Sequence, residues 1–596
     1  MHKDSKRREA LLYHAKPTPG KIQVVPTKKY ATQRDLALAY SPGVAEPCLE
    51  IEKDVNNVYK YTAKGNLVAV ISNGTAVLGL GDIGPEASKP VMEGKGLLFK
   101  IFADIDVFDI EVGTKDIEEF IATVKNISPT FGGINLEDIK APESFEIERR
   151  LVEELNIPVM HDDQHGTAII SSAALLNAVE LAGKKMEEVK MVISGAGSAA
   201  IACANLYVSF GVKPENVVMF NSKGALRKDD PRVSDMQRIY ATDKHYDDLA
   251  HAMKGADVFI GLSSGDIVTP EMLLGMADNP IVFAMANPTP EINYNLAIDT
   301  RKDIIMATGR SDHPNQVNNV LGFPFIFRGA LDVRATKINE EMKKAAVVAL
   351  ANLAKASVPE QVNIAYGETK LTFGRDYIIP KPFDPRLIAE VPPAVAQAAL
   401  ESGVATAPIT DWEKYKDELL ERMGSDNKMI RLLTNRARTN PKRIIFAEAD
   451  QIDVLKAAQI VHEEGIGFPI LLGNQEIIKE LKEEIGFDTE VPIFDPKTKE
   501  SEAKRLEYAK HFWETRKRKG ITLLDAEKWM RERNYFGLMM VNTGEADALV
   551  TGYSRSYPST IKPVIQLIDK APGVSKIATT NMMMTARGPI FLSDTA

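Results

Sequence analysis

Two short acidic segments contain the residue types that most directly suggest catalysis. Glu137 and Asp138 form a carboxylate pair in the first, and Asp162 and Asp163 form a pair in the second, with His161 and His165 on either side of it. Three oxygen ligands from these pairs would suit Mg²⁺ or Mn²⁺. Adjacent acids are also common on solvated faces and at helix caps, and core or hydrogen-bonding roles are more typical of the two histidines. The acidic residues alone therefore leave a metal site and a structural role open.

A glycine-rich segment between a predicted strand and a predicted helix favours a dinucleotide site. Its residues fit the pattern G-x-G-x-x-A and are Gly195, Ala196, Gly197, Ser198, Ala199 and Ala200. In this pattern the first glycine permits a tight turn, the second lets a pyrophosphate approach the backbone, and the helix N-terminus offers N–H groups. We predict a bound nicotinamide dinucleotide, with a tight turn that binds nothing as the alternative.

The residues after the next predicted strand bear on which dinucleotide binds. An acidic residue there would bind the ribose 2′-hydroxyl of NAD. The chain instead has Asn221, Ser222 and Lys223. No carboxylate would repel the 2′-phosphate of NADP, and Ser222 and Lys223 could contact it. We therefore favour NADP, with NAD as the alternative.

A second segment, residues 79–84, also fits the glycine pattern after an apolar run. Asp104 follows about 20 residues later, at the spacing expected of a ribose-binding acid. However, Asp82 would place a carboxylate among the N–H groups that bind phosphate. A loop that lines the active-site cleft is therefore favoured over a separate nucleotide site.

The elements predicted around these segments alternate between strands and helices. In the first part of the chain, apolar runs at 67–72, 97–102 and 107–112 and a helix-start proline, Pro85, indicate an α/β domain. Cleaner alternation follows, with predicted strands at 190–194, 216–221, 257–261 and 280–286 and predicted helices at 168–182 and 198–210. This alternation predicts a doubly wound parallel sheet of the Rossmann type.

The length of 596 residues predicts several domains. We place an N-terminal catalytic domain at 1–162, a dinucleotide-binding domain at 163–335, a helical appendix and linker at 336–424, and a further α/β domain at 425–596. The appendix is predicted to begin as a helix at 338–354 and to become extended around Pro380 and around the pair Pro392 and Pro393.

The last domain is predicted to begin with a strand at 443–446, a helix that ends at Glu463 and a strand at 468–472. The chain ends in strand-like residues, 588–594, which suggests a truncated domain.

The composition indicates a soluble globular protein. Hydrophobic residues make up 44% of the chain and charged residues 26%, which excludes collagen-like, disordered and coiled-coil classes. The net charge of −9 argues against nucleic-acid binding. Two cysteines, Cys48 and Cys203, exclude a disulfide scaffold and suit a reducing compartment. No signal peptide or membrane-spanning segment is evident, so we expect a cytoplasmic protein without a membrane partner.

A set of motifs occurs in a specific order along the chain. They are residues 40–45 (YSPGVA), residues 93–95 (EGK), Glu137-Asp138, residues 161–167 (HDDQHGT), the turn at Gly195, Asn287-Pro288-Thr289 and residues 315–319 (NQVNN). Together they resemble the malic enzymes, specifically the bacterial form fused to a phosphotransacetylase-like domain. The resemblance covers about residues 10–425 well. The tail resembles about the first half of the phosphotransacetylase fold, through residues 443–448, 551–556 and 560–563.

The resemblance implies roles for individual residues. Tyr40 and Lys95 match the catalytic tyrosine and lysine, and the family's three metal carboxylates match Glu137, Asp138 and Asp163. The family's asparagines near the nicotinamide and the substrate match Asn287 and Asn319, and Asn318 is a further substrate-binding candidate. The cofactor loop matches Ala76, Val77, Leu78, Gly79, Leu80, Gly81, Asp82 and Ile83. At the end of the strand that follows the glycine turn, relatives often have an aspartate, and this chain has Asn221.

The activity that the resemblance implies is metal-dependent oxidative decarboxylation of L-malate to pyruvate and CO₂ with reduction of NADP⁺. Lys95 would be the general base, with a pKa lowered by the nearby cation, and Tyr40 would protonate the enolate. The C-terminal domain would be regulatory, with acetyl-CoA as a candidate effector, and a homo-oligomer is expected. The alternatives are a 2-hydroxyacid dehydrogenase without decarboxylation and an acyl-CoA-sensing protein.

Overall fold

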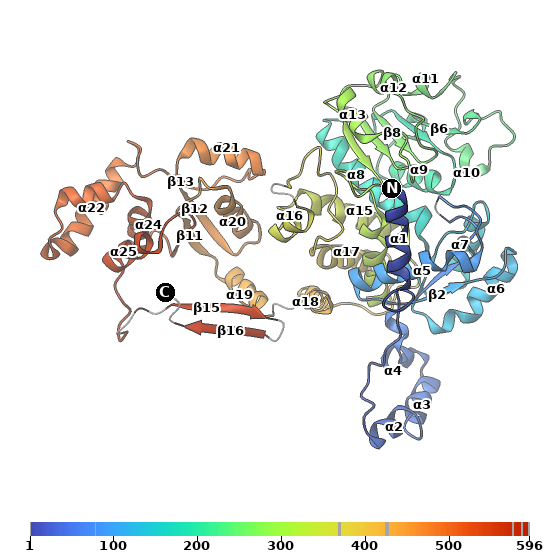
Figure 1. Ribbon diagram of the computed structural model, residues 1–596, viewed down its shortest axis with the longest axis horizontal. Coiled ribbons are helices and arrows are strands. Elements are labelled where there is room, and N and C mark those ends of the chain that lie inside the picture. The colour runs from blue at the N-terminus through green and yellow to red at the C-terminus, as the bar shows by residue number, and fades with distance from the viewer. Residues whose placement is uncertain are drawn as a thin grey trace. The chain divides into compact units, whose positions relative to one another are not determined.

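The structure is a computed structural model that describes residues 2–77, 79–367, 371–423, 428–574, 577, 579–585 and 588–593. The chain forms two units, residues 1–425 and 426–596. The first unit contains two parallel sheets with helical layers, and the second contains a third parallel sheet (Figure 1). The predicted α/β fold class is therefore confirmed.

The first sheet carries the predicted acidic residues where its strands end. Its four strands are parallel and lie in the order β2-β1-β3-β4. Its strands and helices are β1 (Leu67–Ser72), β2 (Asp106–Glu111), β3 (Gly133–Leu136), β4 (Val159–His161), α5 (Pro85–Ala103), α6 (Ile117–Ile127) and α7 (Glu143–Glu154). Strands β1 and β3 are buried along their whole length, as continuous apolar runs covered on both faces should be.

The apolar run at 97–102 belongs to helix α5 and not to a strand. The buried residues of this helix include Met92, Lys95, Phe99 and Ala103, which recur every three or four positions. That spacing is the period of an amphipathic helix. It also places Lys95 on the buried face of α5 among apolar neighbours.

The second sheet is doubly wound, as predicted. Its strand order is β10-β9-β8-β5-β6-β7, with β7 antiparallel at one edge. Its elements are β5 (Met191–Ser194), β6 (Val217–Asn221), β7 (Gly224–Ala225), β8 (Val258–Gly261), β9 (Ile281–Ala284), β10 (Ile305–Thr308), α8 (Asp162–Leu181) and α9 (Ser198–Ser209). The strand order reverses at β5, which lies between β6 and β8. In such sheets ligands bind at the carboxyl ends of the strands at this point.

A helical layer follows the second sheet along the chain. Its helices are α14 (Phe323–Asp332), α15 (Glu340–Lys355), α16 (Glu360–Tyr366), α17 (Leu387–Glu401) and α18 (Trp412–Arg422). The extended conformation expected around Pro392 and Pro393 is wrong, because both lie inside α17. Both prolines are buried, and α17 packs on α14 so closely that a Cβ on Gly329 would lie 2.5 Å from the carbonyl oxygen of Pro392. Tertiary packing here overrides the helix-breaking tendency of proline.

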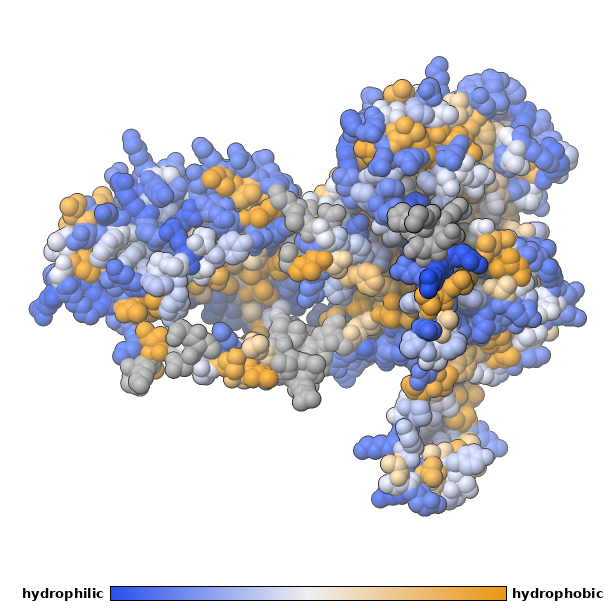
Figure 2. Space-filling model, in the orientation of Figure 1, coloured by the Kyte–Doolittle hydropathy of each residue, from blue (hydrophilic) through white to orange (hydrophobic). Residues whose placement is uncertain are grey.

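An N-terminal arm, residues 33–61, projects from the rest of the first unit (Figure 1). It follows α1 (His2–Ala15) and consists of α2 (Gln33–Ala39), α3 (Ala45–Lys53), a short 3₁₀ turn (Val55–Asn57) and α4 (Val58–Tyr61). None of these four arm elements contains a buried residue. Figure 2 shows hydrophobic residues in orange on its surface, among hydrophilic ones in blue. The arm therefore has no core of its own within this chain.

The C-terminal unit has a four-stranded parallel sheet in the order β13-β12-β11-β14. Its strands are β11 (Lys442–Phe446), β12 (Gly467–Leu472), β13 (Ile493–Phe494) and β14 (Ala548–Val550), and β15 (Thr580–Thr585) pairs with β16 (Gly588–Ser593) as a separate antiparallel ribbon. Its helices are α19 (Lys428–Thr439), α20 (Ile452–Glu463), α21 (Gln475–Ile485), α22 (Glu502–Arg516), α23 (Leu523–Trp529), α24 (Arg533–Asn542) and α25 (Tyr557–Leu567). In the part of the chain that the structure describes, no helix is long and apolar enough to cross a membrane.

Candidate functional site

Lys95 lies at the centre of a buried group of charged residues. Its Nζ is 2.7 Å from Asp162 Oδ2 and 2.8 Å from Glu137 Oε1. The same nitrogen lies 4.2 Å from the centroid of the Phe323 ring, which covers it as a cation–π partner. Only 9% of the surface of Lys95 is exposed. The structure thus joins one predicted catalytic residue to one predicted metal carboxylate.

The predicted carboxylates converge because they follow neighbouring parallel strands. Glu137 and Asp138 come directly after β3, and Asp163 lies in the first turn of α8, which follows β4. The backbone N–H of Asp138 donates to Asp163 Oδ2 at 2.8 Å, and Asn135 Nδ2 donates to Glu137 Oε2 at 2.8 Å. Asp138 has a φ of 52°, a conformation that non-glycine residues adopt rarely and that clusters at functional sites.

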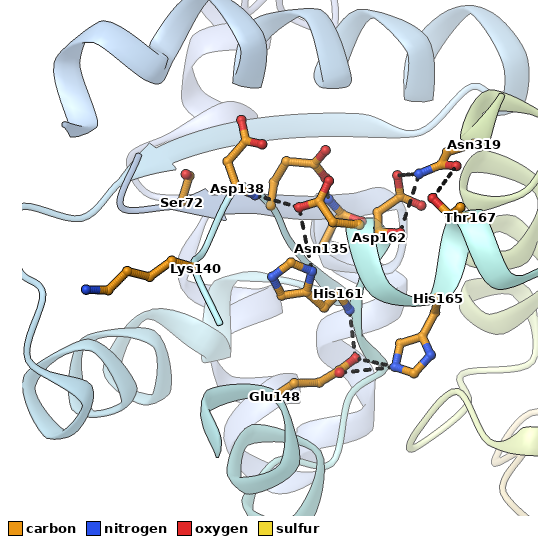
Figure 3. Close-up of polar contacts among 12 residues, drawn as sticks. Ser72, Asn135, Asp138, Lys140, Glu148, His161, Asp162, His165, Thr167 and Asn319 are labelled. Carbon is orange, nitrogen blue, oxygen red and sulfur yellow. Dashed lines mark hydrogen bonds and ion pairs between the residues drawn. The ribbon is translucent and has the colours of Figure 1, made fainter. Parts of the chain in front are cut away.

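Asp162 belongs to the same group, although its sequence motif predicted no individual role for it. Its Oδ2 accepts from Lys95 and also from Asn319 Nδ2, at 3.1 Å, while Thr167 Oγ1 donates to Asn319 Oδ1 at 3.2 Å (Figure 3). Within the described residues, the buried Oδ1 of Asp162 accepts no hydrogen bond. Its position next to Asp163 was the only signal in the sequence. The structure thereby connects the predicted Asn319 to the charged group.

Gly166 closes one side of this arrangement. A Cβ on Gly166 would lie 2.2 Å from Asp162 Oδ1 and 2.9 Å from Asn319 Cγ. These distances are shorter than any tolerated contact, so the absence of a side chain at this position lets Asp162 and Asn319 meet.

The charges shift the pKa values of the two central groups. Burial, reinforced mainly by Asp163, raises the pKa of Glu137 well above its usual range, although Lys95 opposes the shift. Burial by itself would lower the pKa of Lys95, but the Asp162, Glu137 and Asp163 carboxylates outweigh it and hold the pKa above its ordinary value. The lowered pKa expected for Lys95 beside a cation is not the direction found here, because its neighbours carry negative charge.

A second series of polar contacts, among His161, Glu148, His165 and Lys343, adjoins this charged group. Glu148 Oε1 accepts from the backbone N–H of His161 at 2.8 Å, and His165 Nε2 lies 3.1 Å from Glu148 (Figure 3). Burial would raise the pKa of Glu148, but His165 and His161 lower it to about 2. Lys343 Nζ lies 3.1 Å from the other ring nitrogen of His165. His165 therefore has a hydrogen-bonding role.

The donor set suits a divalent cation, although its present geometry is not a ligand shell. Among the described residues, no group of three or more His, Cys, Asp or Glu side chains is arranged to hold a metal ion. Glu137 and Asp162 are ion-paired with Lys95 in this arrangement. Carboxylate oxygens are nevertheless the ligands that Mg²⁺ and Mn²⁺ prefer, and Asp162 Oδ1 is a buried oxygen without a hydrogen bond.

The glycine turn has the geometry of a phosphate-binding turn. Gly195 has a φ of 126°, and a Cβ there would lie 2.7 Å from the carbonyl oxygen of Leu262, so only glycine fits. A Cβ on Gly197 would meet nothing within 4 Å, which leaves open space in front of the start of α9. Ala200 is buried, and Ala196, Ser198 and Ala199 complete the turn and the first turn of α9.

At the end of β6, the Asn221 side chain caps the following turn. Its Oδ1 accepts from the backbone N–H of Lys223 at 2.8 Å. Ser222 and Lys223 are exposed. No carboxylate occupies the strand end, as the sequence indicated.

The second glycine-rich loop lies beside the predicted nicotinamide segment. A Cβ on Gly79 would approach Pro288 Cδ at 3.9 Å, so the loop contacts the chain next to Asn287. Val77 and Gly81 form a bridge across the loop, and Asp82 Oδ2 is ion-paired with Lys115 Nζ at 2.7 Å. Leu78 lies outside the described residues. Asn318, a predicted substrate-binding residue, caps a short 3₁₀ helix, Asn319–Leu321, because its Oδ1 accepts from the backbone N–H of Val320 at 3.0 Å.

Tyr40 is the predicted catalytic residue that the structure does not bring to Lys95. It follows α2 in the projecting arm, and 78% of its surface is exposed. Its hydroxyl therefore faces solvent, while Lys95 is buried in the body of the first unit.

Three parts of the chain match known protein families. Residues 19–152 match the family described as "Malic enzyme, N-terminal domain", and residues 164–367 match "Malic enzyme, NAD binding domain". Residues 428–596 match "Phosphate acetyl/butaryl transferase". The resemblance to malic enzymes joined to a phosphotransacetylase-like domain is thus confirmed.

Individual relatives extend this result over the whole chain. The NADP-dependent malic enzyme of Haemophilus influenzae is 51% identical over 99% of this chain and 78% of its own length. The NAD-dependent malic enzyme of Rhizobium meliloti is 48% identical over 98% of this chain and 77% of its own. Among solved structures, the malic enzyme from Pyrococcus horikoshii matches 71% of this chain and 98% of its own with a TM-score of 0.64 and 42% identity.

Proposed function

Since the chain belongs to the malic enzyme family, we propose that it converts L-malate to pyruvate and CO₂ and reduces NADP⁺. The observation that supports this activity best is the buried position of Lys95, with its Nζ between oxygens of Glu137 and Asp162. A lysine fixed at the ends of parallel strands is placed to accept a proton from a substrate hydroxyl once a bound cation offsets the carboxylate charges that hold it protonated.

Each proton in the reaction can be assigned to a group of this chain. Lys95 accepts the proton of the C2 hydroxyl, and a nicotinamide dinucleotide bound at the Gly195 turn would supply the acceptor for the hydride of C2. Loss of CO₂ leaves an enolate, Tyr40 donates a proton to its C3 to give pyruvate, and the proton held by Lys95 then replaces the one that Tyr40 has lost. The chemistry that Mg²⁺ or Mn²⁺ held by Glu137, Asp138 and Asp163 would supply is polarisation of the C2 oxygen and a positive charge that opposes the proton on Lys95.

The test of this activity is the reduction of NADP⁺ and of NAD⁺ by L-malate with Mn²⁺, with pyruvate and CO₂ measured together. Equal amounts of reduced cofactor, pyruvate and CO₂ are expected. Oxaloacetate without CO₂ would favour a 2-hydroxyacid dehydrogenase instead. We expect NADP⁺ to be preferred, because no carboxylate stands at the end of β6; a preference for NAD⁺ would contradict the role given to Asn221, Ser222 and Lys223.

We further propose that a second copy of the chain covers the N-terminal arm and receives Tyr40 from it. The arm exposes a set of large apolar side chains: Leu36, Leu38, Tyr40, Val44, Leu49 and Val55. Short helices without a buried face are not stable alone in water, so a partner surface is needed. Because Tyr40 lies away from Lys95 of its own chain, each site would combine Lys95 of one chain with Tyr40 of the other.

Complementation between two inactive variants tests this sharing. Lys95→Ala and Tyr40→Phe should each be nearly inactive. Co-expressed in equal amounts, they should regain about a quarter of the wild-type activity, because half of randomly formed two-fold pairs are mixed and each mixed pair has one intact site. Steady-state turnover of the purified mixture measures this. Lys95→Ala co-expressed with the Lys95→Ala/Tyr40→Phe double variant must stay inactive, and an inactive test mixture would refute the shared site.

Gly166→Ala should lower kcat/KM on the order of 10²-fold, because the new methyl group must displace Asp162 or Asn319 by part of an ångström or more. Gly113→Ala is the matched control, since a Cβ there meets nothing within 4 Å. Thermal melting of both variants checks that the fold is kept. Normal kinetics in Gly166→Ala would show that the packing of Asp162 against Asn319 does not matter for turnover.

For the C-terminal unit we propose regulation by acetyl-CoA. The match of residues 428–596 to phosphate acetyl/butaryl transferases supports recognition of an acetyl thioester. Acetyl-CoA should change malate turnover by the full chain, whereas free CoA should act more weakly. Identical effects of the two compounds would exclude recognition of the acetyl group.

A further inference from the structure

A large cavity lies on the opposite side of α8 from Lys95. Its volume is about 940 Å³, and α7, the start of α8 and the middle of α9 line it. Neither Lys95 nor the carboxylates of Glu137, Asp138 and Asp163 line this cavity. A volume of this size matches sites that enclose small organic molecules. Nothing in the proposed reaction uses it.

Most of the cavity surface is apolar, and charged side chains of both signs line the rest of it. The apolar lining includes Phe145, Val152, Met160, Ile201, Leu206 and Ile338. The charged lining consists of Arg149 paired with Glu146 and Glu153, His165 paired with Glu148, Lys343 paired with Glu340, and Lys337, and the lining also includes the amide of Gln164. Lys343 Nζ lies 2.7 Å from Glu340 Oε1 and 3.1 Å from His165 Nδ1, so these charges are already balanced by the protein.

In the described part of the chain, the side-chain amide of Gln164 has no hydrogen-bond acceptor and the ammonium of Lys337 has no ion-pair partner. Gln164 is 2% exposed, and its buried Nε2 has no hydrogen-bond acceptor. A buried amide without a partner is costly, so an acceptor from a ligand would offset the penalty. Lys337 at the rim is exposed and forms no ion pair with any described acidic side chain. By contrast, Arg149 at the rim is paired with Glu146 and Glu153.

We propose that this cavity binds a small carboxylic acid with an apolar body. Its carboxylate oxygens would accept from Gln164 Nε2 and face the charge of Lys337, and its body would cover the apolar wall. The ligand would act on both halves of the active centre. It would contact α8 directly beside Asp162 and Asp163, and it would contact α9, which begins at the dinucleotide turn. We therefore assign the cavity as an effector site that changes the affinity for malate.

The cavity is tested with 4-phenylbutyrate as the probe and its neutral amide as the comparison. Binding to the whole protein is measured by calorimetry, which does not depend on turnover. Ala202→Trp, which places an indole inside the cavity, should weaken binding at least tenfold, whereas Ala122→Trp on the exposed side of α6 should not. Lys337→Gln should weaken the acid about threefold and leave the amide unchanged, which is the size expected of a partly exposed charge pair. Lys213→Gln, also an exposed lysine, is its control.

Each outcome decides one part of the assignment. No binding to the wild type, or equal binding to the wild type and a folded Ala202→Trp, would overturn the site. Equal binding of acid and amide would overturn the preference for a carboxylate. A saturating probe should change the KM for malate in the wild type and leave it unchanged in Ala202→Trp; binding without a change of KM would overturn the effector role. Because binding is read separately, an error in the proposed reaction would not be mistaken for an error here.

Discussion

Lys95→Ala is expected to lower kcat for malate oxidation by about 10³-fold or more, a loss of the size that general acid–base catalysis typically contributes. The reason is that Lys95 is the one basic side chain bonded to both Glu137 and Asp162 among the described residues. Binding of NADPH, followed by its fluorescence, should remain near normal, because the glycine turn at Gly195 lies in the other sheet.

Lys95→Arg separates catalysis from folding. Removing the only ammonium between two buried carboxylates destabilises a protein, so an inactive alanine variant could simply be unfolded. Arginine keeps the positive charge but cannot act as a base near neutral pH. Lys95→Arg should therefore melt closer to the wild type and still be inactive, while Lys89→Ala, on the exposed side of the same helix, should be active. Substantial turnover by Lys95→Arg would exclude Lys95 as the base.

Asp163→Ala should raise the Mn²⁺ concentration needed for half-maximal turnover by at least about 10²-fold, since it removes both a proposed ligand and a support of another. Asp163 Oδ2 accepts from the backbone N–H of Asp138, whose φ of 52° needs such a constraint. Direct titration of Mn²⁺ by electron paramagnetic resonance should show the same loss of affinity.

Asp163→Asn distinguishes the two contributions. Its amide oxygen can still accept from Asp138, but its negative charge is gone. It should fall between the wild type and Asp163→Ala in Mn²⁺ affinity, whereas Asp278→Ala, an exposed acid far along the chain, should match the wild type. If Asp163→Ala titrates like the wild type, Asp163 is not a ligand.

The local elements were predicted well where a sequence pattern is compatible with only one kind of secondary structure. Strands β5, β6, β8 and β9 of the second sheet and the turn at Gly195 were predicted within a residue or two, because the pattern there allows few alternatives, whereas β7 and β10 were not predicted. The run at 97–102 was ambiguous, since a short apolar run fits a strand or a buried helix face equally well. The helical pair Pro392 and Pro393 was predicted wrongly because its conformation is set by packing against α14.

The site was only partly predictable for a similar reason. Lys95, Glu137 and Asn319 are widely separated in sequence, and their motifs identified them before any contact was known. Asp162 was recognised as one of a pair of acids but was given no role of its own, because its role depends on which side of the α8 start faces Lys95, and no residue spacing shows that. The supporting role of Glu148 was missed as well, since an acid on a helix normally lies in water.

The lack of any buried residue in the arm has a consequence for the enzyme in dilute solution. Fixing these residues in one conformation costs about 1–2 kcal/mol each in backbone entropy, and no interior of their own offsets that cost. If contacts with another molecule offset that cost, the arm becomes ordered only on association. Tyr40 is then positioned to donate its proton at the same moment. Specific activity would then depend on protein concentration, and assays at nanomolar enzyme would underestimate the rate at cellular concentrations.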